Sequence, residues 1–394
     1  MILFIVILMD ILTGMEFDLF VPSFPELQDY FQISPFRVEL SLSVNFIGYC
    51  ISLFVAGELA DRYGRKPIIL VGLLGFIVGS AFCLTAHSYY VFLFGRFIQG
   101  LGIAAPSILS FLIIADLYTL KKQQFLMAML NASFNTAAGF APVIGSFITK
   151  YFHWEGNFIT LLSLGCIVFL MTVFFIPHVK FTPLKKQSLL KNYSEILQSK
   201  TIILLMIYFI LSFIPYWIFV GITPLLYLKS LGVSLNHFGF YQGSLALVFA
   251  FGSLVFGWFI HRYDHKKLLL FANKITILSL ISLLFVTFWN GHNPLLITLA
   301  FIPFVIGQII PGNILHPLYL NLKPESKGRL TALIQGGRLI FASIGLQVAG
   351  FFYDGSFHNI GMIVSGVVLI GIIVMYIVIK QWNLINNVKS ESSN

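Results

Sequence analysis

Long apolar runs divide the chain, and they restrict its possible folds more than any other feature of the sequence. Twelve runs of roughly 20 residues alternate with shorter polar segments. The 394 residues are 58% hydrophobic and only 10% charged, with a mean hydropathy of +0.91. A soluble domain carries about 25% charged residues, so a polar surface could not cover these runs. We therefore expect an integral membrane protein.

Each run is long enough to cross a bilayer as a helix, since about 20 residues span its apolar core. The sequence therefore predicts an all-α integral membrane fold with twelve transmembrane helices. The expected helices lie at 1–24, 37–60, 67–86, 90–115, 125–149 and 156–177 in the first half, and at 201–228, 237–260, 268–289, 295–320, 330–353 and 359–380 in the second half.

An internal repeat indicates that the two halves are related. The segment GELADRYGRKPIIL begins at Gly57 and returns 200 residues later as GWFIHRYDHKKLLL, which begins at Gly257, with five of fourteen positions identical. Such a repeat between apolar runs predicts two pseudo-symmetric six-helix bundles. The expected divisions are an N-terminal bundle 1–177, a cytoplasmic linker 178–200, a C-terminal bundle 201–382 and a cytoplasmic tail 383–394.

Basic residues predict the orientation. Eighteen of the 24 Lys and Arg residues lie in one alternating set of loops, which includes the linker and the tail, whereas the opposite loops hold only Arg37, Lys150 and Lys229. Because cytoplasmic loops are enriched in Lys and Arg, we expect both termini in the cytoplasm. Topology thus accounts for the net charge of +9, and no nucleic-acid partner is expected.

Several motifs resemble one transporter family. The turn fits the G-x-L-A-D-R-x-G-R-K signature of the major facilitator superfamily through Gly57, Asp61, Arg62, Gly64, Arg65 and Lys66. The segment from Asp18 to Pro25, with Pro22 between them, resembles the D-x-x-x-P-x-x-P motif of the bicyclomycin/chloramphenicol-resistance (Bcr/CflA) drug:proton antiporters. The segment from Arg96 to Gly100 is similar to their helix 4 motif. Pro142 and Gly145 resemble part of the helix 5 antiporter signature.

The resemblance implies a proton-coupled secondary transporter of a bacterial inner (cytoplasmic) membrane, which exports drugs or amphipathic metabolites by alternating access. It also implies that the Gly57–Lys66 turn acts as a conformational lock. Ala128, Ala137, Ala141 and Ser146 replace glycines of the antiporter signature, which leaves the direction of transport open. The alternatives are an importer of an anionic metabolite or siderophore, and a transporter-like sensor.

Acids in the first apolar run are candidates for proton coupling, because ionisable groups inside a membrane are costly and mark functional sites. Glu16 and Asp18 point about 200° apart on a helix. A rise of about 1.5 Å per residue places Asp18 and Arg96 at similar depths. The position of Asp18 relative to Pro22 resembles that of the family's proton-carrying acid. The resemblance thus implies that Asp18 carries the proton, the similar depths favour its pairing with Arg96, and Glu16 remains an alternative carrier.

Polar and aromatic residues of the other runs suggest a cavity for amphipathic molecules. The candidates are Asn45, Tyr49, Asn131, Asn135, Tyr216, Trp217, Gln242, Gln308, Asn313 and Arg338. The role of Arg338 stays open between the turn network and an anionic substrate. The sequence has no metal-ligand spacing, nucleophile–base arrangement or phosphate-binding loop, so we expect no enzyme and no cofactor. The expected partners are a small-molecule substrate, protons and the lipid bilayer, and the chain is expected to be a monomer.

Overall fold

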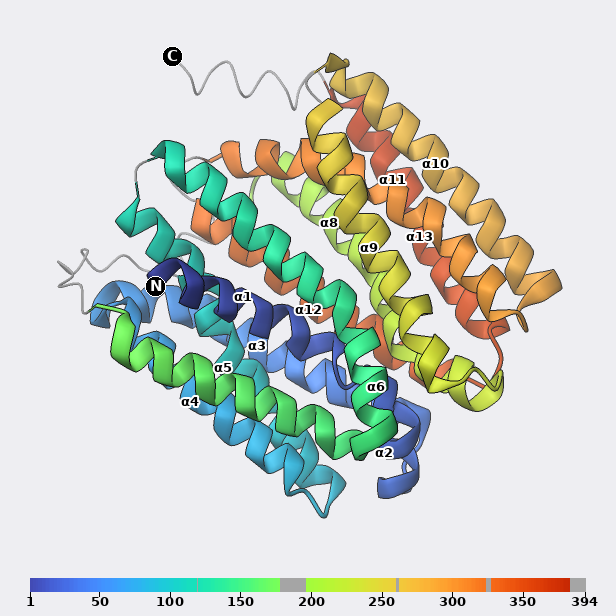
Figure 1. Cartoon of the computed structure of the whole chain (residues 1–394). Coiled ribbons are helices and arrows are strands. Elements are labelled where there is room, and N and C mark those ends of the chain that lie inside the picture. The colour runs from blue at the N-terminus through green and yellow to red at the C-terminus, as the bar shows by residue number, and fades with distance from the viewer. Residues whose placement is uncertain (119, 178–195, 260–261, 324–326, 383–394) are drawn as a thin grey trace. The chain divides into compact units, whose positions relative to one another are not determined.

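The computed structural model describes residues 1–118, 120–177, 196–259, 262–323 and 327–382. Helices and short connections make up all of these residues, and no strand occurs among them (Figure 1). Most of the predicted linker 178–200 and the predicted tail 383–394 lie outside the described residues.

The first half of the chain contains five long helices. Its elements are α1 (Ile2–Asp18), the 3₁₀ turn η1 (Val21–Ser23), α2 (Phe24–Phe31), α3 (Pro35–Tyr63), α4 (Arg65–Leu84), α5 (Tyr89–Leu117) and α6 (Leu120–Phe175). The 56-residue α6 is interrupted at His153, where φ is 56° and ψ is −171°. This residue divides α6 into the two helices that the apolar runs predict.

The second half contains six long helices. Its elements are α8 (Lys200–Thr223), the π-helical turn η2 (Pro224–Ser230), α9 (Leu235–Phe259), α10 (His265–Phe285), the π-helical turn η4 (Val286–Asn290), α11 (Pro294–Asn321), α12 (Lys327–Phe352) and α13 (His358–Lys380). In the described parts of the chain, nine helical stretches are long and apolar enough to cross a membrane. One of these nine, Met129–Phe175, includes the interruption at His153 and therefore covers both parts of α6. The predicted all-α membrane class is confirmed.

The first predicted helix, 1–24, is shorter in the structure. α1 ends at Asp18, and Pro22 lies in the first turn of η1, where its missing N–H group costs nothing. The chain then enters α2, which the hydropathy pattern does not reveal. Asp18 is therefore the last residue of α1, at the point where the chain leaves the α-helix.

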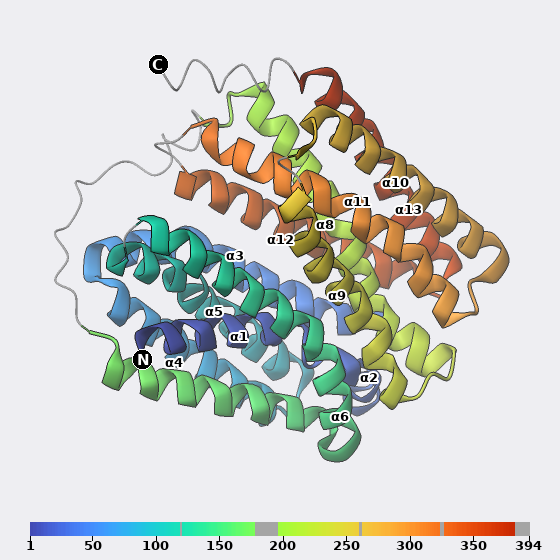
Figure 2. The same ribbon diagram turned by 45° about the horizontal axis from the view of Figure 1, so that its top comes forward.

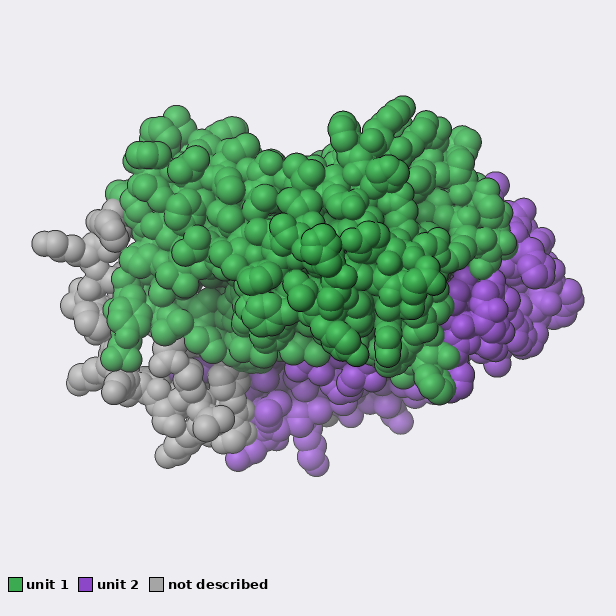
Figure 3. Space-filling view, turned by 90° about the horizontal axis from the view of Figure 1, so that it is seen from below, with its two compact units in different colours: residues 1–185, 220–247, 346–351 green, residues 186–219, 248–345, 352–394 purple. Residues whose placement is uncertain are grey.

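Two compact units are present, and each is described here by itself (Figure 3). Unit 1 consists of Met1–Lys185, Val220–Leu247 and Leu346–Phe351, and unit 2 of Lys186–Phe219, Val248–Gly345 and Phe352–Asn394. These units are defined by contacts. The division at 177 and 201, which rests on the sequence repeat, stays a prediction.

The helices α1, α3, α5 and α6 of unit 1 lie side by side (Figure 2). Glycines let them approach one another closely. A Cβ atom on Gly14 of α1 would collide with the carbonyl oxygen of Phe134 on α6, and one on Gly100 of α5 would collide with that of Asn45 on α3. Gly102 of α5 lies equally close to the backbone of Phe76 on α4. Small residues permit such backbone contact between membrane helices.

Unit 2 has its own apolar core, built by α8, α10, α11, α12 and α13. Buried residues of these helices, including Leu205, Leu269, Leu315 and Val378, pack in one cluster. α10 lies against both α11 and α13.

Candidate proton-coupling and substrate sites

A fully buried ion pair joins α1 to α5 in unit 1. Nη1 of Arg96 lies 2.9 Å from Oε1 of Glu16, and both side chains are 0% exposed. Charged groups removed from water in this way require each other, because an unpaired buried charge costs several kcal/mol. This pair therefore links α1 and α5 through opposite charges that water does not reach.

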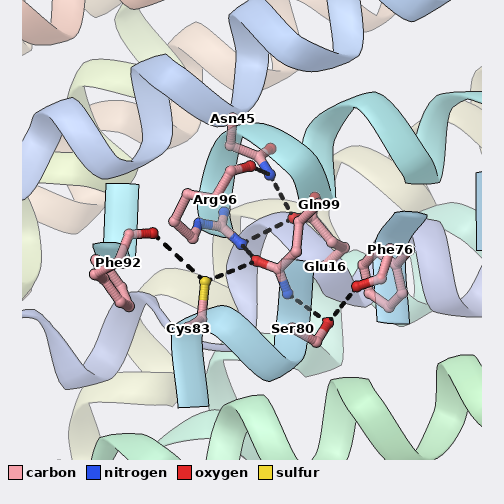
Figure 4. A network of polar contacts seen from close by, with 8 residues as sticks. All are labelled: Glu16, Asn45, Phe76, Ser80, Cys83, Phe92, Arg96 and Gln99. Carbon is pink, nitrogen blue, oxygen red and sulfur yellow. Dashed lines mark hydrogen bonds and ion pairs between the residues drawn. The ribbon is translucent and has the colours of Figure 1, made fainter. Parts of the chain in front are cut away.

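Neutral polar side chains surround the pair (Figure 4). The side-chain amide of Asn45 donates to Oε1 of Glu16 at 2.8 Å and to the carbonyl oxygen of Arg96 at 3.0 Å. Arg96 also donates to Oε1 of Gln99 at 2.6 Å, and Gln99 donates to Oγ of Ser80 at 2.7 Å. The network therefore includes α1, α3, α4 and α5.

Aromatic rings cover the rest of the guanidinium group. Cζ of Arg96 lies 4.1 Å from the centroid of the Phe20 ring and 6.0 Å from that of Phe158. Nε and Nη2 of Arg96 have no hydrogen-bond partner in the described structure. A ring face attracts a cation, so these contacts hold Arg96 in place without satisfying all of its donors.

The expected pair of Asp18 with Arg96 is not formed, and Glu16 takes this position. Asp18 is 4% exposed, and its Oδ1 has no hydrogen-bond partner in the part of the chain that the structure describes. The helical rise predicts only the depth of a residue, whereas the rotation of α1 decides which acid faces α5. Glu16 and Asp18 point in different directions, as their spacing requires.

A third acid of α1, Asp10, is 1% exposed and accepts a hydrogen bond from Oγ of Ser110 at 3.0 Å. α1 thus carries three buried carboxyl groups, and each has one oxygen without a hydrogen-bond partner among the described residues. Such oxygens can bind a proton without breaking an existing contact. Protonation of Glu16 would also remove the negative charge with which Arg96 pairs.

The turn between α3 and α4 is partly described. Gly64 ends α3 with φ at +94°, a conformation that favours glycine. Nε of Arg65 donates to Oδ2 of Asp116 at 3.2 Å, and Nζ of Lys66 donates to the carbonyl oxygen of Val173 at 2.7 Å. Arg62 is exposed and lies over the ring of Tyr63.

The other two members of this turn are Gly57 and Asp61. A Cβ atom on Gly57 would meet nothing within 4 Å among the described residues, so packing against them does not explain this glycine. The side chain of Asp61 lies outside the described part of the structure.

The helix 5 motif lies in the first part of α6. A Cβ atom on Gly145 would collide with the carbonyl oxygen of Leu19, so this glycine lets α6 touch the end of α1. The carbonyl oxygen of Pro142 accepts a hydrogen bond from Oγ of Ser146 at 2.7 Å. The motif therefore positions the backbone directly beside Asp18.

The predicted cavity residues of unit 1 are in different environments. Asn45 belongs to the ion-pair network, and the hydroxyl of Tyr49 lies 2.8 Å from that of Ser107. The amides of Asn131 and Asn135 bond to the backbone of their own helix.

Gln242 differs from these residues. It is 1% exposed, and neither polar atom of its side chain has a hydrogen-bond partner in the described residues.

Unit 2 contains a small cavity, and Gln308 is the predicted residue that lines it. The hydroxyl of Tyr208 donates to Oε1 of Gln308 at 2.9 Å, and both residues line this cavity. Nε of Arg338 donates to the carbonyl oxygen of Phe209 at 3.3 Å, and its Cζ lies 5.2 Å and 5.3 Å from the ring centroids of Phe209 and Phe213.

The other predicted residues of unit 2 extend along α8 and α11. The ring of Trp217 is buried and packs against Phe213 and Tyr216. Nδ2 of Asn313 has no hydrogen-bond partner within the described segments.

Sequence reasoning missed Gln99, Ser80 and Tyr208. Neutral polar residues in an apolar run carry no distinctive pattern, and only their partners reveal a role. Their one signal is the spacing of Gln99 from Arg96, three residues along a helix, which puts both side chains on one face. Within the described residues, no group of three or more His, Cys, Asp or Glu side chains could hold a metal ion.

Comparison with known proteins supports the motif interpretation. The family model described as "Major Facilitator Superfamily" matches residues 6–345. The chain belongs to the Major Facilitator Superfamily. It is therefore a multi-pass membrane transporter and not an enzyme, and the predicted family resemblance is confirmed.

Its relatives carry resistance names. The chain is 29% identical over 341 residues to a bicyclomycin resistance protein homolog of Haemophilus influenzae, with 83% of each chain covered. It is 25% identical over 378 residues to the multidrug resistance protein MdtL of Shewanella oneidensis, covering 94% of this chain and 93% of the relative.

The solved structures that it resembles confirm the fold. A D-xylose–proton symporter matches with a TM-score of 0.74 and 15% identity, over 95% of this chain and 96% of the other. The xylose transporter XylE of E. coli, in an inward-open conformation, matches with a TM-score of 0.74 and 13% identity, over 95% of each chain. At such identities the likeness concerns the fold alone.

Proposed function

We propose that this transporter couples the inward movement of protons to the export of drugs or amphipathic metabolites. The observation that carries the proposal is the buried Glu16–Arg96 pair, because burying charges is costly and ionisable groups inside a membrane mark functional sites such as proton relays. The names of the relatives, bicyclomycin resistance and multidrug resistance proteins, support a drug as the substrate.

Proton coupling would work through the charge on Glu16. While Glu16 is ionised, Arg96 is neutralised within the pair at 2.9 Å. A proton on Glu16 leaves Arg96 with Gln99 and the Phe20 ring as its remaining partners, so Arg96 becomes free to move. Asp18 lies two residues away at the end of α1, and we assign to it the exchange of this proton with water.

The Gly57–Lys66 turn would act as the conformational lock, in a bacterial inner membrane with both termini in the cytoplasm. The contacts of Arg65 with Asp116 and of Lys66 with Val173 support a defined arrangement of this turn. Its orientation is supported by the eighteen basic residues on one side of the predicted topology.

Transport in proteoliposomes tests the proposal. We expect a pH gradient to drive the movement of bicyclomycin or another amphipathic drug, and we expect Glu16→Gln to abolish this gradient-driven transport. Counterflow under equal pH, which needs no proton movement, should survive in that variant. Full gradient-driven transport by Glu16→Gln would refute coupling through the pair, and an absence of transport with every drug tested would refute the substrate class.

An importer of an anionic metabolite is the second candidate, and Arg338 favours it. Among the described residues, the guanidinium contacts a backbone carbonyl and two aromatic rings, and no carboxylate pairs with it. Such a cation can receive a carboxylate or phosphate of a substrate. Uptake of a siderophore or small acid that Arg338→Gln abolishes would support the importer, whereas binding without counterflow would indicate a sensor.

A further inference from the structure

Glu39, near the start of α3, is a buried acid that the proton-coupling pair does not use. Its side chain is 0% exposed, and neither carboxyl oxygen has a hydrogen-bond partner in the described residues. An ionised carboxylate without a partner is strongly disfavoured in an apolar environment. The packing around Glu39 therefore requires the neutral, protonated form.

Two glycines from other helices make the space for this carboxyl group. A Cβ atom on Gly221 of α8 would collide with Oε2 of Glu39, and one on Gly350 of α12 would lie 3.0 Å from its Cγ. All three residues belong to unit 1. The carboxyl group thus lies where α3 packs against the end of α8 and the end of α12.

A second contact closes the same face of α3. Nε2 of Gln347 on α12 donates to Oγ of Ser43, one helical turn after Glu39, at 3.0 Å. Segments from opposite halves of the sequence are therefore in contact at Glu39. A transporter that works by alternating access must break such contacts in one state of its cycle.

Among the described residues, no nearby cation neutralises Glu39. On its own helix, Arg37 is exposed, and its carbonyl oxygen accepts a hydrogen bond from Tyr89 of α5 at 2.6 Å. Lys229 of η2 is bound to Asp29 and Gln28 of α2. On α5, Arg96 is engaged with Glu16, while α8 and α12 present Gly221, Leu346 and Gly350 to this region.

We propose that Glu39 is a second proton-binding residue, which is protonated when α3 packs against α8 and α12 and releases its proton when they separate. On separation the O–H bond of the carboxyl group breaks, water accepts the proton, and the carboxylate becomes hydrated. Closure reverses this step, so that a proton is bound each time the contact forms. The proposal rests on the chain being an alternating-access transporter and does not depend on Glu16.

The sign of the pH dependence follows from this assignment. The packed state holds one proton more than the separated state, so rising pH disfavours packing. Above the pKa of the hydrated carboxyl group, ordinarily about 4.3, the packed population should fall by up to about tenfold per pH unit.

Disulfide formation between Ser43→Cys and Gln347→Cys measures the packed population directly. The protein is the full chain in proteoliposomes, with Cys50, Cys83 and Cys166 replaced by Ala, and copper–phenanthroline is the oxidant. Cross-linking rates are compared with and without Glu39→Gln between pH 5 and pH 8. Because both proteins have the same thiols, the ratio of their rates cancels the pH dependence of thiol chemistry.

We expect the Glu39→Gln protein to cross-link at a rate that rises relative to the parent protein as pH increases, by up to about tenfold per unit. Glu39→Asp, which keeps an ionisable group, should retain the parent profile. Glu39→Met, also neutral and similar in length, provides a second test if Gln is not tolerated.

A rate ratio that does not change with pH for either neutral variant would overturn the role of Glu39. The assay contains no substrate and no pH gradient, so it gives its answer whether or not the chain exports drugs. Likewise, if Glu16→Gln abolishes gradient-driven drug transport, the cross-linking result for Glu39 is unaffected.

Discussion

Replacing Glu16 by Gln should lower the free energy of unfolding, because it leaves the buried Arg96 without its counter-ion. Removing one member of a buried pair costs about 3–5 kcal/mol, because it leaves an uncompensated charge. Arg96 would keep its 2.6 Å bond to Gln99 and the Phe20 ring at 4.1 Å. We therefore expect the lower end of this range, about 3 kcal/mol of the free energy of unfolding.

A double-mutant cycle measures this value through reversible unfolding in mixed micelles. The proteins are the parent, Glu16→Gln, Arg96→Met and the double variant, whose loss should be smaller than the sum of the single losses by about 3 kcal/mol. The matched control is the pair of Arg65 with Asp116, whose side chains are 12% and 33% exposed. Such a partly exposed pair should couple by less than about 1 kcal/mol. Equal coupling energies for the two pairs would refute the reasoning from burial.

Two further predictions concern packing and topology. Gly145→Ala should lower the free energy of unfolding by about 1–3 kcal/mol, because the added methyl group would meet the carbonyl oxygen of Leu19. Gly312→Ala is the control, since its Cβ would meet nothing within 4 Å in the described parts of the chain, and equal effects would contradict the proposed close approach. A cysteine at Ser188 should resist an impermeant thiol reagent applied to intact spheroplasts, and ready labelling there would reverse the proposed orientation.

The helices could be predicted from the sequence because each one satisfies the same length and hydropathy requirement. The expected break after residue 149 is present, although it is confined to the backbone of His153. The early end of α1 could not be read from hydropathy, since residues 19–24 remain largely apolar while Pro22 changes the backbone.

The site was harder to predict because its geometry depends on helix rotation. Depth along the helix gave a reasonable pairing of Arg96 with an acid of α1, but it could not choose between Glu16 and Asp18. Glu39 is the fifth residue of α3, where an acid resembles an ordinary interfacial residue. Only the glycines of α8 and α12 reveal that it is enclosed.

The close helix contacts of unit 1 also have an evolutionary consequence. At Gly14, Gly100 and Gly102, any larger residue would collide with the backbone of a neighbouring helix. Selection for resistance to a new compound therefore has little freedom at these positions, whatever the chemistry of that compound. Variants with a broader substrate range should instead carry changes in side chains such as Gln242 and Tyr208, while the helix crossings that hold the Glu16–Arg96 pair stay constant.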